Sequence, residues 1–310
     1  MRSVIVTGAN GFVGSALIKQ LLNKGIQVCA IVNKNTYRLD IIDNLTIIQC
    51  SLSELSDLLQ KCPKKEYDTF YHFAWEGSAG PERTNYELQL LNAKYTLDAI
   101  KIAKELGCSR FVVAGTIMEH ETIAATYKPD NKPGLPYIYG AGKTVTHLMA
   151  APYASSLGID LIWAEITNTY GPGEISPRLV NTTLKKCIKG ISPEFTAGTQ
   201  NYDFVYIDDM ARAFYLIGKN GKPFRSYLIG SSNARPLKEF LLEMKNAVAP
   251  NIEFKFGDVP FSGVDLPLSQ FDTSMTFEDT GFKAKISFGE GCKRTYKWLQ
   301  KMEDINDSKI

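Results

Sequence analysis

Short apolar runs alternate with longer segments of helical periodicity through the first half of the chain. The apolar runs predict strands at Val4–Thr7, Gln27–Val32, Leu45–Gln49, Thr69–Phe73, Arg110–Ala114 and Asp160–Glu165. The periodic segments predict helices at Phe12–Lys24, Ser53–Lys61, Tyr86–Leu106 and Tyr139–Leu157. Strands separated by helices of this length indicate βαβ units and a parallel sheet. Right-handed crossovers then give a doubly wound α/β sheet with helices on both faces.

Beyond about Tyr170 this alternation loosens, and proline-containing loops become frequent. The predicted elements there are strands at Phe204–Ile207, Ser226–Ile229 and Ile252–Lys255 and helices at Arg178–Lys189, Asp209–Gly218, Leu237–Ala247 and Gly289–Gln300. We therefore expect a main sheet domain at residues 1–169, to which some later segments return. Residues 170–310 are expected to form mainly a smaller α/β lobe that binds the substrate beside the carboxyl ends of the strands.

A glycine-rich loop, Thr7–Gly14, joins the first strand to the first helix. Gly8, Gly11 and Gly14 are spaced for a tight turn, for close approach of a pyrophosphate and for helix–strand packing. Free N–H groups at the start of the helix then bind the anion. In this context the motif predicts a Rossmann-type domain that binds a dinucleotide. The other expected cofactor-binding residues of the loop are Asn10, Phe12 and Val13.

The end of the second strand bears on the choice between NAD(H) and NADP(H). An acidic residue there would bind the ribose 2′-hydroxyl. The chain instead has Asn33, Lys34 and Arg38, and no acidic residue before Asp40. The two cations favour NADP(H), whose 2′-phosphate they would face. NAD(H) remains the alternative, in which they are solvated loop residues.

Tyr139 and Lys143 are four residues apart near the start of a predicted helix, so they share one helical face. An ammonium group beside a phenol stabilises the tyrosinate, which lets the phenol exchange a proton near neutral pH. Hydride transfer to or from a carbonyl needs such a proton partner. Thr116 follows the fifth strand, where its hydroxyl can bind the same carbonyl oxygen.

Composition and charge limit the kinds of partner that the protein is expected to bind. The 310 residues carry a net charge of +2, which gives no electrostatic footprint for nucleic acid or an anionic membrane. There is no apolar run long enough to span a bilayer, and the N-terminus has no signal-peptide pattern. The six scattered cysteines indicate reduced thiols in a cytoplasmic protein. His72, His120 and His147 have no metal-ligand spacing, so no metal site is expected.

Several motifs occur together in one order along the chain. They are Gly8/Gly11/Gly14, His72-Phe73-Ala74, Thr116, Tyr139/Lys143, Asn168–Gly173 and Asp203–Asp209. In this order they resemble the extended short-chain dehydrogenase/reductase family, in its nucleotide-sugar epimerase/dehydratase branch, over nearly the whole chain. The resemblance implies a catalytic triad of Thr116, Tyr139 and Lys143, with Tyr139 as acid/base. It also implies a cofactor that runs past Phe73 and Ala74 to Tyr139, and a homodimer formed through two of the helices.

The same resemblance suggests where a nucleotide-sugar substrate binds. Asn168 would meet the diphosphate or the sugar, whereas Arg178, Tyr206 and Arg235 would hold the nucleotide. Arginine suits a diphosphate because its guanidinium offers paired donors. Trp75, Glu76 and Met118 are the expected residues of the sugar pocket.

Departures from the family pattern limit the reaction. Family 4,6-dehydratases have Asp-Glu after the catalytic Thr, but this chain has Ile117-Met118, which transfer no proton. Trp75 replaces a smaller residue, and Glu165 replaces a frequent arginine. The favoured function is an NAD(P)-dependent 4-ketoreductase of a nucleotide sugar, and the alternative is a 4-epimerase with retained NAD. A catalytically silent dinucleotide sensor and a reductase of non-sugar carbonyls are less favoured.

Overall fold

The computed structural model describes residues 1–40, 42–63 and 66–307. The chain divides into two compact units, each built from more than one stretch of sequence. The first unit comprises Met1–Ile166, Ala211–Ile229 and Thr273–Phe282. The second comprises Thr167–Met210, Gly230–Asp272 and Lys283–Ile310.

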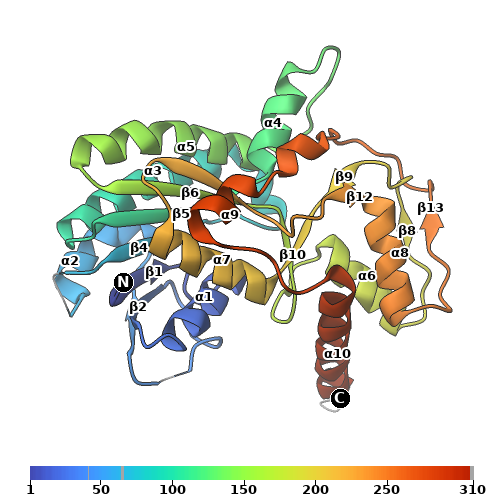
Figure 1. Ribbon diagram of the computed structural model, residues 1–310, viewed down its shortest axis with the longest axis horizontal. Coiled ribbons are helices and arrows are strands. Elements are labelled where there is room, and N and C mark those ends of the chain that lie inside the picture. The colour runs from blue at the N-terminus through green and yellow to red at the C-terminus, as the bar shows by residue number, and fades with distance from the viewer. Residues whose placement is uncertain (41, 64–65, 308–310) are drawn as a thin grey trace. The chain divides into compact units, whose positions relative to one another are not determined.

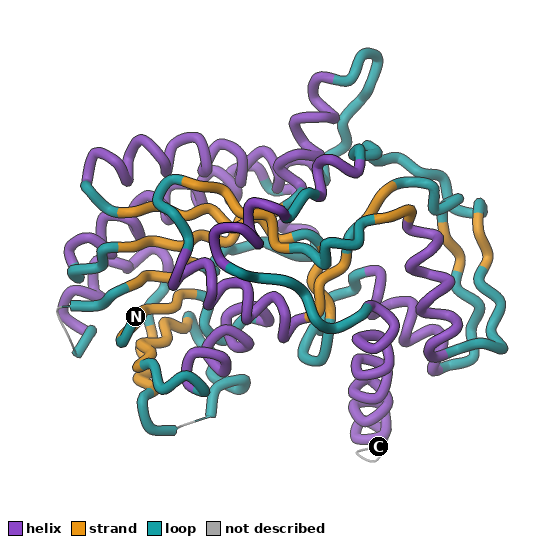
Figure 2. The backbone as a smooth tube through the Cα atoms, viewed as in Figure 1, coloured by secondary structure: helices purple, strands orange, loops and turns teal. Residues whose placement is uncertain are grey.

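The first unit contains a seven-stranded parallel sheet in the described part of the chain (Figure 2). Its strands are β1 (Ser3–Thr7), β2 (Gln27–Val32), β3 (Leu45–Gln49), β4 (Thr69–His72), β5 (Arg110–Thr116), β6 (Asp160–Ile166) and β11 (Arg225–Ile229). They lie in the order β11-β6-β5-β4-β1-β2-β3. Every neighbouring pair is parallel. The predicted α/β fold with a Rossmann-type sheet is therefore confirmed.

Helices cover both faces of this sheet. The helical elements of the first unit are α1 (Phe12–Leu22), η1 (Leu52–Asp57), α2 (Leu58–Lys61), η2 (Pro81–Thr84), α3 (Tyr86–Glu105), α4 (Met118–Tyr127), α5 (Tyr137–Leu157), most of α7 (Ile207–Asn220) and α9 (Ser274–Thr280). Figure 1 shows α3 and α5 together on one face and α1 and α7 on the other. Phe70 and Phe111 stack in the core beneath α3 and α5, with their ring centroids 5.2 Å apart.

Local structure differs from the sequence-based expectation at several places, and two of them are described here. The predicted helix Ser53–Lys61 is a 3₁₀ segment followed by one short α turn, and the backbone at Glu54 is non-helical. Helix α4 was not predicted. It begins directly after β5 without a side-chain cap, and its polar and apolar residues do not separate onto two faces, so it lacks the usual sequence signals.

The second unit has short two-stranded sheets and longer helices. Its elements are β7 (Asn168–Tyr170), α6 (Leu179–Ile188), β8 (Glu194–Phe195), β9 (Asn201–Tyr202), β10 (Phe204–Tyr206), β12 (Arg235–Pro236), α8 (Leu237–Val248), β13 (Lys255–Phe256), η3 (Leu268–Phe271) and α10 (Phe288–Asp307). Tyr170, Phe204, Phe240 and Phe288 form an aromatic core. Among the described residues, every helix is too short or too polar to cross a membrane.

Candidate active site

The glycine loop makes the tight turn that its sequence predicts. Gly8 has φ of +65°, and a Cβ there would lie 2.7 Å from the backbone nitrogen of Ala74. The Gly11 N–H donates to the Gly8 carbonyl at 2.9 Å, which closes the turn before α1. Any side chain at Gly14 would collide with the same carbonyl. The cradle therefore depends on glycine, as close approach of a pyrophosphate requires.

The loop after β2 is tied to this cradle at one residue. The backbone N–H of Arg38 donates to Oδ1 of Asn10 at 2.9 Å. The Arg38 guanidinium lies over the Tyr37 ring, 5.2 Å from its centroid. Asn33 and Lys34 are exposed. The Arg38 backbone is thus held beside the glycine loop, whereas Lys34, in the same loop, is exposed to solvent.

The end of β4 joins the glycine loop through backbone and hydroxyl contacts. The Phe73 N–H donates to the Thr7 carbonyl at 3.3 Å, and the Ala74 N–H donates to the Thr7 hydroxyl at 3.4 Å. Both ring nitrogens of His72 lie within hydrogen-bond distance of threonine hydroxyls. Burial, with a contribution from the charge of Lys143, lowers the pKa of His72 to about 3. His72 is therefore a neutral structural residue at physiological pH.

Lys143 is buried beside the carboxyl end of β5. Its Nζ donates to the Ala114 carbonyl at 2.8 Å and lies 3.7 Å from the centroid of the Trp75 ring. Burial lowers the pKa of Lys143 to about 7, although the charge of Glu119 acts in the opposite direction. The indole face and the carbonyl both favour the ammonium form. The side chain is therefore poised to exchange a proton near neutrality.

Tyr139 lies among large side chains in the same region. The Trp75 ring meets it edge to face with centroids 6.2 Å apart, and the Arg83 guanidinium carbon lies 4.4 Å from the Tyr139 centroid. The Trp75 indole N–H donates to Gln89 Oε1 at 2.7 Å, which fixes the ring. Gln89 was not among the predicted site residues, because a contact between separate segments leaves no local sequence signal.

Thr116 and the residues around it complete this part of the site. The Met118 N–H donates to the Thr116 hydroxyl at 3.3 Å, and the Met118 sulfur contacts the Arg83 guanidinium. Glu76 is fixed through its backbone, which exchanges two hydrogen bonds with the Asn92 side chain, while its own side chain is exposed. The structure thus brings Thr116, Met118, Trp75, Tyr139 and Lys143 together through these contacts.

The other proposed substrate residues lie in the second unit, and we describe their surroundings there. Asn168 donates to the Asp203 carbonyl at 3.1 Å. Arg178 is half-exposed, with its Nε 3.6 Å from Oε2 of Glu174.

Tyr206 and Arg235 are also tied to neighbours within the second unit. Arg235 pairs with Glu243 and lies over the Phe240 ring. Tyr206 is buried under Arg294, and burial raises its pKa to about 12. Their roles toward a substrate, like those of Asn168 and Arg178, remain predictions.

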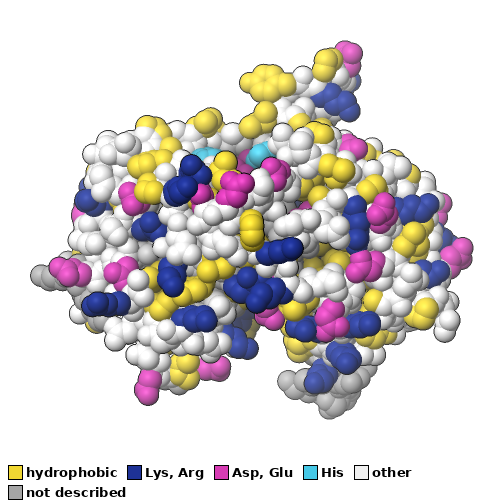
Figure 3. All heavy atoms as spheres, viewed as in Figure 1, with side chains coloured by type: hydrophobic (Ala, Val, Ile, Leu, Met, Phe, Trp, Pro, Cys, Tyr) yellow, Lys and Arg dark blue, Asp and Glu magenta, His cyan; other side chains and the backbone are white. Residues whose placement is uncertain are grey.

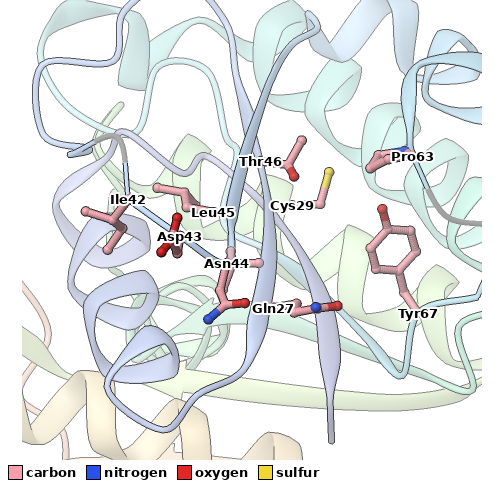
Figure 4. Close-up of a pocket in the computed structure, with 10 residues that line it drawn as sticks. Gln27, Cys29, Ile42, Asp43, Asn44, Leu45, Thr46, Pro63 and Tyr67 are labelled. Carbon is pink, nitrogen blue, oxygen red and sulfur yellow. The ribbon is translucent and has the colours of Figure 1, made fainter.

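A pocket of about 440 Å³ lies elsewhere in the first unit, at the amino ends of β2 and β3 (Figure 4). Gln27, Cys29, Thr46 and Tyr67 are among its lining residues. Ligands of open α/β sheets bind at the carboxyl ends of the strands. This pocket is therefore separate from the dinucleotide cradle, and we assign it no role in the reaction.

The chain is similar to several known proteins. The most similar curated proteins include a UDP-glucuronic acid decarboxylase of Arabidopsis thaliana, 27% identical over 94% of this chain and 68% of that protein. Similar solved structures include UDP-N-acetylglucosamine 4-epimerase from Methanobrevibacter ruminantium M1 (TM-score 0.81, 22% identity, 97% of this chain and 99% of that one). Another is the Bordetella bronchiseptica enzyme WbmF in complex with NADH (TM-score 0.79, 21% identity, 99% and 94%).

The family comparison spans both units of the structure. The model of the NAD dependent epimerase/dehydratase family matches residues 4–230, which include the glycine loop and the Tyr139–Lys143 pair. This match covers well over half of the chain. The chain therefore belongs to the NAD dependent epimerase/dehydratase family.

Proposed function

We propose that this protein is an oxidoreductase that reduces a 4-keto-sugar carried on a nucleotide, with NADPH as the hydride donor. The observation that carries the proposal is the grouping of Tyr139, Lys143 and Thr116 by their contacts with Trp75, Arg83 and Met118. The group lies at the carboxyl end of the sheet, in the unit that contains the Gly8 cradle. That is the edge where open α/β sheets bind dinucleotides and substrates.

The residues suggest a simple division of labour. The dinucleotide, when bound, supplies hydride to C4 of the sugar. Tyr139 donates its phenolic proton to the C4 oxygen, and the Thr116 hydroxyl donates a hydrogen bond to that oxygen. The Lys143 ammonium favours the tyrosinate that remains, and a pKa of about 7 lets it exchange a proton readily. Tyr139 then regains a proton from solvent, directly or through neighbouring groups.

Elimination of water, as in a 4,6-dehydratase, is disfavoured. The two residues after Thr116 are apolar in this chain. The Glu119 carboxylate, three residues after Thr116, accepts hydrogen bonds from the Thr116 backbone and the Trp163 indole, so it is engaged in holding the fold. A dehydratase needs a free acid and base beside the sugar.

Two observations favour a reductase over a 4-epimerase. Arg38 is fastened to the glycine loop through Asn10, which supports contact with a ribose 2′-phosphate. Trp75 and Arg83 enclose Tyr139, which reduces the room for a keto-sugar to rotate before hydride returns. The epimerase with retained NAD is the second candidate, favoured by the family description and by the NADH complex of the similar Bordetella enzyme.

The cofactor carried by freshly purified protein distinguishes the two candidates. Acid release and mass spectrometry would identify any bound dinucleotide, and titration would compare NADPH with NADH. Protein without bound cofactor that binds NADPH more tightly than NADH supports the reductase. Tightly retained NAD(H) supports the epimerase and makes the Arg38 contact incidental to cofactor choice.

Replacement of Tyr139 by Phe tests the chemistry itself. We expect Tyr139→Phe to lower turnover of a keto-sugar nucleotide by about 10²–10⁴-fold, because the proton donor is lost. NADPH affinity, measured by fluorescence titration, should stay within about twofold, because the cradle is unchanged. Turnover that survives this substitution would show the catalytic assignment to be wrong. Stabilisation by a lipophilic ketone and by no nucleotide sugar would instead indicate a non-sugar carbonyl substrate.

We also propose that the protein acts as a cytoplasmic homodimer. Large apolar side chains are exposed on α3 and α5, namely Tyr86, Leu90, Leu91, Val145, Leu148 and Met149. Exposed apolar side chains on two helices that pack together are typical of a protein–protein interface. A second copy of the chain is the expected occupant.

A further inference from the structure

A cluster of histidine and glutamate side chains lies close to Thr116 but outside the catalytic group. Glu119 of α4, His147 of α5 and Glu165 of β6 each offer one ligand atom, and these atoms all lie within 4.8 Å of one another. Figure 3 shows histidine side chains at the surface near acidic side chains. The cluster joins three elements of the first unit that follow one another along the chain.

The cluster contains two carboxylates and no lysine or arginine. Glu119 and Glu165 are 3% and 8% exposed, so two carboxylates are buried side by side. Neutral imidazoles would leave this group with a charge of about −2, and buried charges are stable only when they are paired or bind a metal. Lys143 acts on Glu119 electrostatically. A divalent cation would neutralise both carboxylates.

One carboxylate oxygen in the cluster is open to a new ligand. Oε2 of Glu165 lies 2.8 Å from His120 Nε2, but Oε1 accepts no hydrogen bond within the described residues. That oxygen lies 4.0 Å from Nδ1 of His147. Nδ1 is in turn 3.1 Å from Oε2 of Glu119. One nitrogen and two oxygen atoms thus lie within 4.8 Å of one another.

These spacings fit a first-row divalent metal. Zinc binds imidazole nitrogen and carboxylate oxygen at about 2.0–2.2 Å in tetrahedral geometry, so its ligand atoms lie roughly 3.3–3.5 Å apart. Two of the observed separations, 3.1 and 4.0 Å, lie on either side of this range, and all three ligand atoms lie within 4.8 Å of one another. Small side-chain rotations would therefore complete the site. A fourth position remains for water.

The neighbouring residues already hold the ligands in place. The Trp163 ring stacks on His147 with centroids 4.3 Å apart and an angle of 6°, and its indole N–H donates to Glu119. The Ser226 hydroxyl lies 3.1 Å from Nε2 of His147, so a proton on Nε2 can be donated to it while Nδ1 binds metal. Outer contacts of this kind orient the ligands of metal sites.

We propose that Glu119, His147 and Glu165 form a binding site for a divalent cation of the zinc type. Binding places the metal where a proton on His147 Nδ1 would otherwise lie, and any such proton leaves to solvent. Because Glu119 also accepts the Thr116 backbone N–H at 2.9 Å, the ion fastens α4, α5 and β6 around that residue. The proposal concerns binding, so it stands apart from the sugar reaction proposed above.

Equilibrium dialysis of chelator-treated protein against Zn²⁺, followed by elemental analysis, tests the proposal. We expect one ion per chain, with a dissociation constant in the micromolar range or below. Both His147→Asn and Glu165→Gln should weaken binding by at least about tenfold, while circular dichroism verifies that each variant is folded. Glu165→Gln is the matched conservative change, because its amide oxygen can still accept from His120.

A control variant separates this site from the free thiols of the chain. Cys62→Ser should leave Zn²⁺ binding unchanged, because Cys62 is not a member of the cluster. Replacement of zinc by Co²⁺ should give visible d–d bands without the charge-transfer band of a thiolate ligand. Substoichiometric zinc, unchanged affinity in both cluster variants or loss of binding in Cys62→Ser would each overturn the proposal. In that case a protonated His147 between the two carboxylates would be the simpler account of the charge.

Discussion

At the scale of single residues, Lys143 shows how burial turns an ordinary cation into a group that titrates near neutrality. Its amine is enclosed by the Trp75 ring and the Ala114 carbonyl, and burial is the largest cause of its lowered pKa. The positive charge is costly in this setting, and the cation–π contact and the carbonyl offset only part of that cost. The buried Lys143 ammonium therefore lowers the stability of the folded protein.

The pH dependence of stability follows from that pKa. The pKa of Lys143 is about 7 in the folded protein and near its ordinary value of 10.5 in the unfolded chain. Between these values the unfolded state binds one more proton, so the free energy of unfolding rises with pH by about 1.4 kcal/mol per unit. Below pH 7 both states bind the proton, and the full penalty is present.

Urea denaturation of the wild type and of Lys143→Met between pH 7.5 and 9.5 measures this contribution. We expect the wild type to gain about 2–3 kcal/mol relative to the variant across that range. Cysteine and tyrosine groups titrate in both proteins, so only the difference between them is informative. Parallel pH profiles for the two proteins would mean that Lys143 keeps its ordinary pKa when folded.

At the scale of secondary-structure elements, α3 and α5 pack together on one face of the sheet (Figure 1). Both helices nevertheless retain exposed apolar side chains. Gly142 makes the close packing possible, since a Cβ there would lie 2.9 Å from the Gln89 Cβ of α3. Leu148 is 71% exposed on the outer side of α5. One side of this helix pair thus packs against the core. The other side has apolar side chains that nothing in the described part of the chain covers.

Light scattering after size-exclusion chromatography tests the proposed dimer at this surface. The wild type should elute as a dimer, and Leu148→Glu should shift it to monomer, because a buried unpaired carboxylate opposes association. Tyr127→Glu is a matched control, since Tyr127 is 82% exposed on α4 and not on α3 or α5. A wild type that stays monomeric at high concentration would contradict the proposal, as would a dimer unaffected by Leu148→Glu.

The sequence predicts helices and strands well where the signal for each lies within one short segment. The glycine loop and each of the strands β1 to β6 are predicted from a contiguous run of residues, and the structure has them where they are expected. Helix α4 escaped prediction because it lacks a cap and a clear apolar face. The stacking of Lys143 on Trp75 and the meeting of Glu119 with His147 and Glu165 depend on which distant segments the fold brings together. No single stretch of sequence contains that information.

At the scale of the whole molecule, neither compact unit is a contiguous piece of chain. The first unit takes β11, most of α7 and α9 from beyond residue 210. These later segments are bonded into it: Arg110 donates to the Gly218 carbonyl at 2.7 Å, and Thr276 donates to the Leu228 carbonyl at 2.8 Å. A cut at the first boundary would therefore remove part of the sheet and one of its covering helices.

Thermal denaturation of a fragment of residues 1–166 tests this interdependence. We expect the fragment to lack a cooperative transition or to aggregate, because β6 loses its partner β11 and the face that carried α7 is exposed. The full chain should unfold cooperatively under the same conditions. A soluble fragment with a sharp transition close to that of the full chain would show that the later segments contribute little.

The pairing of β11 with β6 also matters while the ribosome is still synthesising the chain. Strand β6 is complete at Ile166, but the strand that covers its edge begins only at Arg225. At a synthesis rate of about 5–20 residues per second, the β6 edge stays unpaired for several seconds while the ribosome synthesises the intervening residues. The nascent chain must pass through this interval with an open sheet edge, and that interval is when we expect cellular chaperones to protect it.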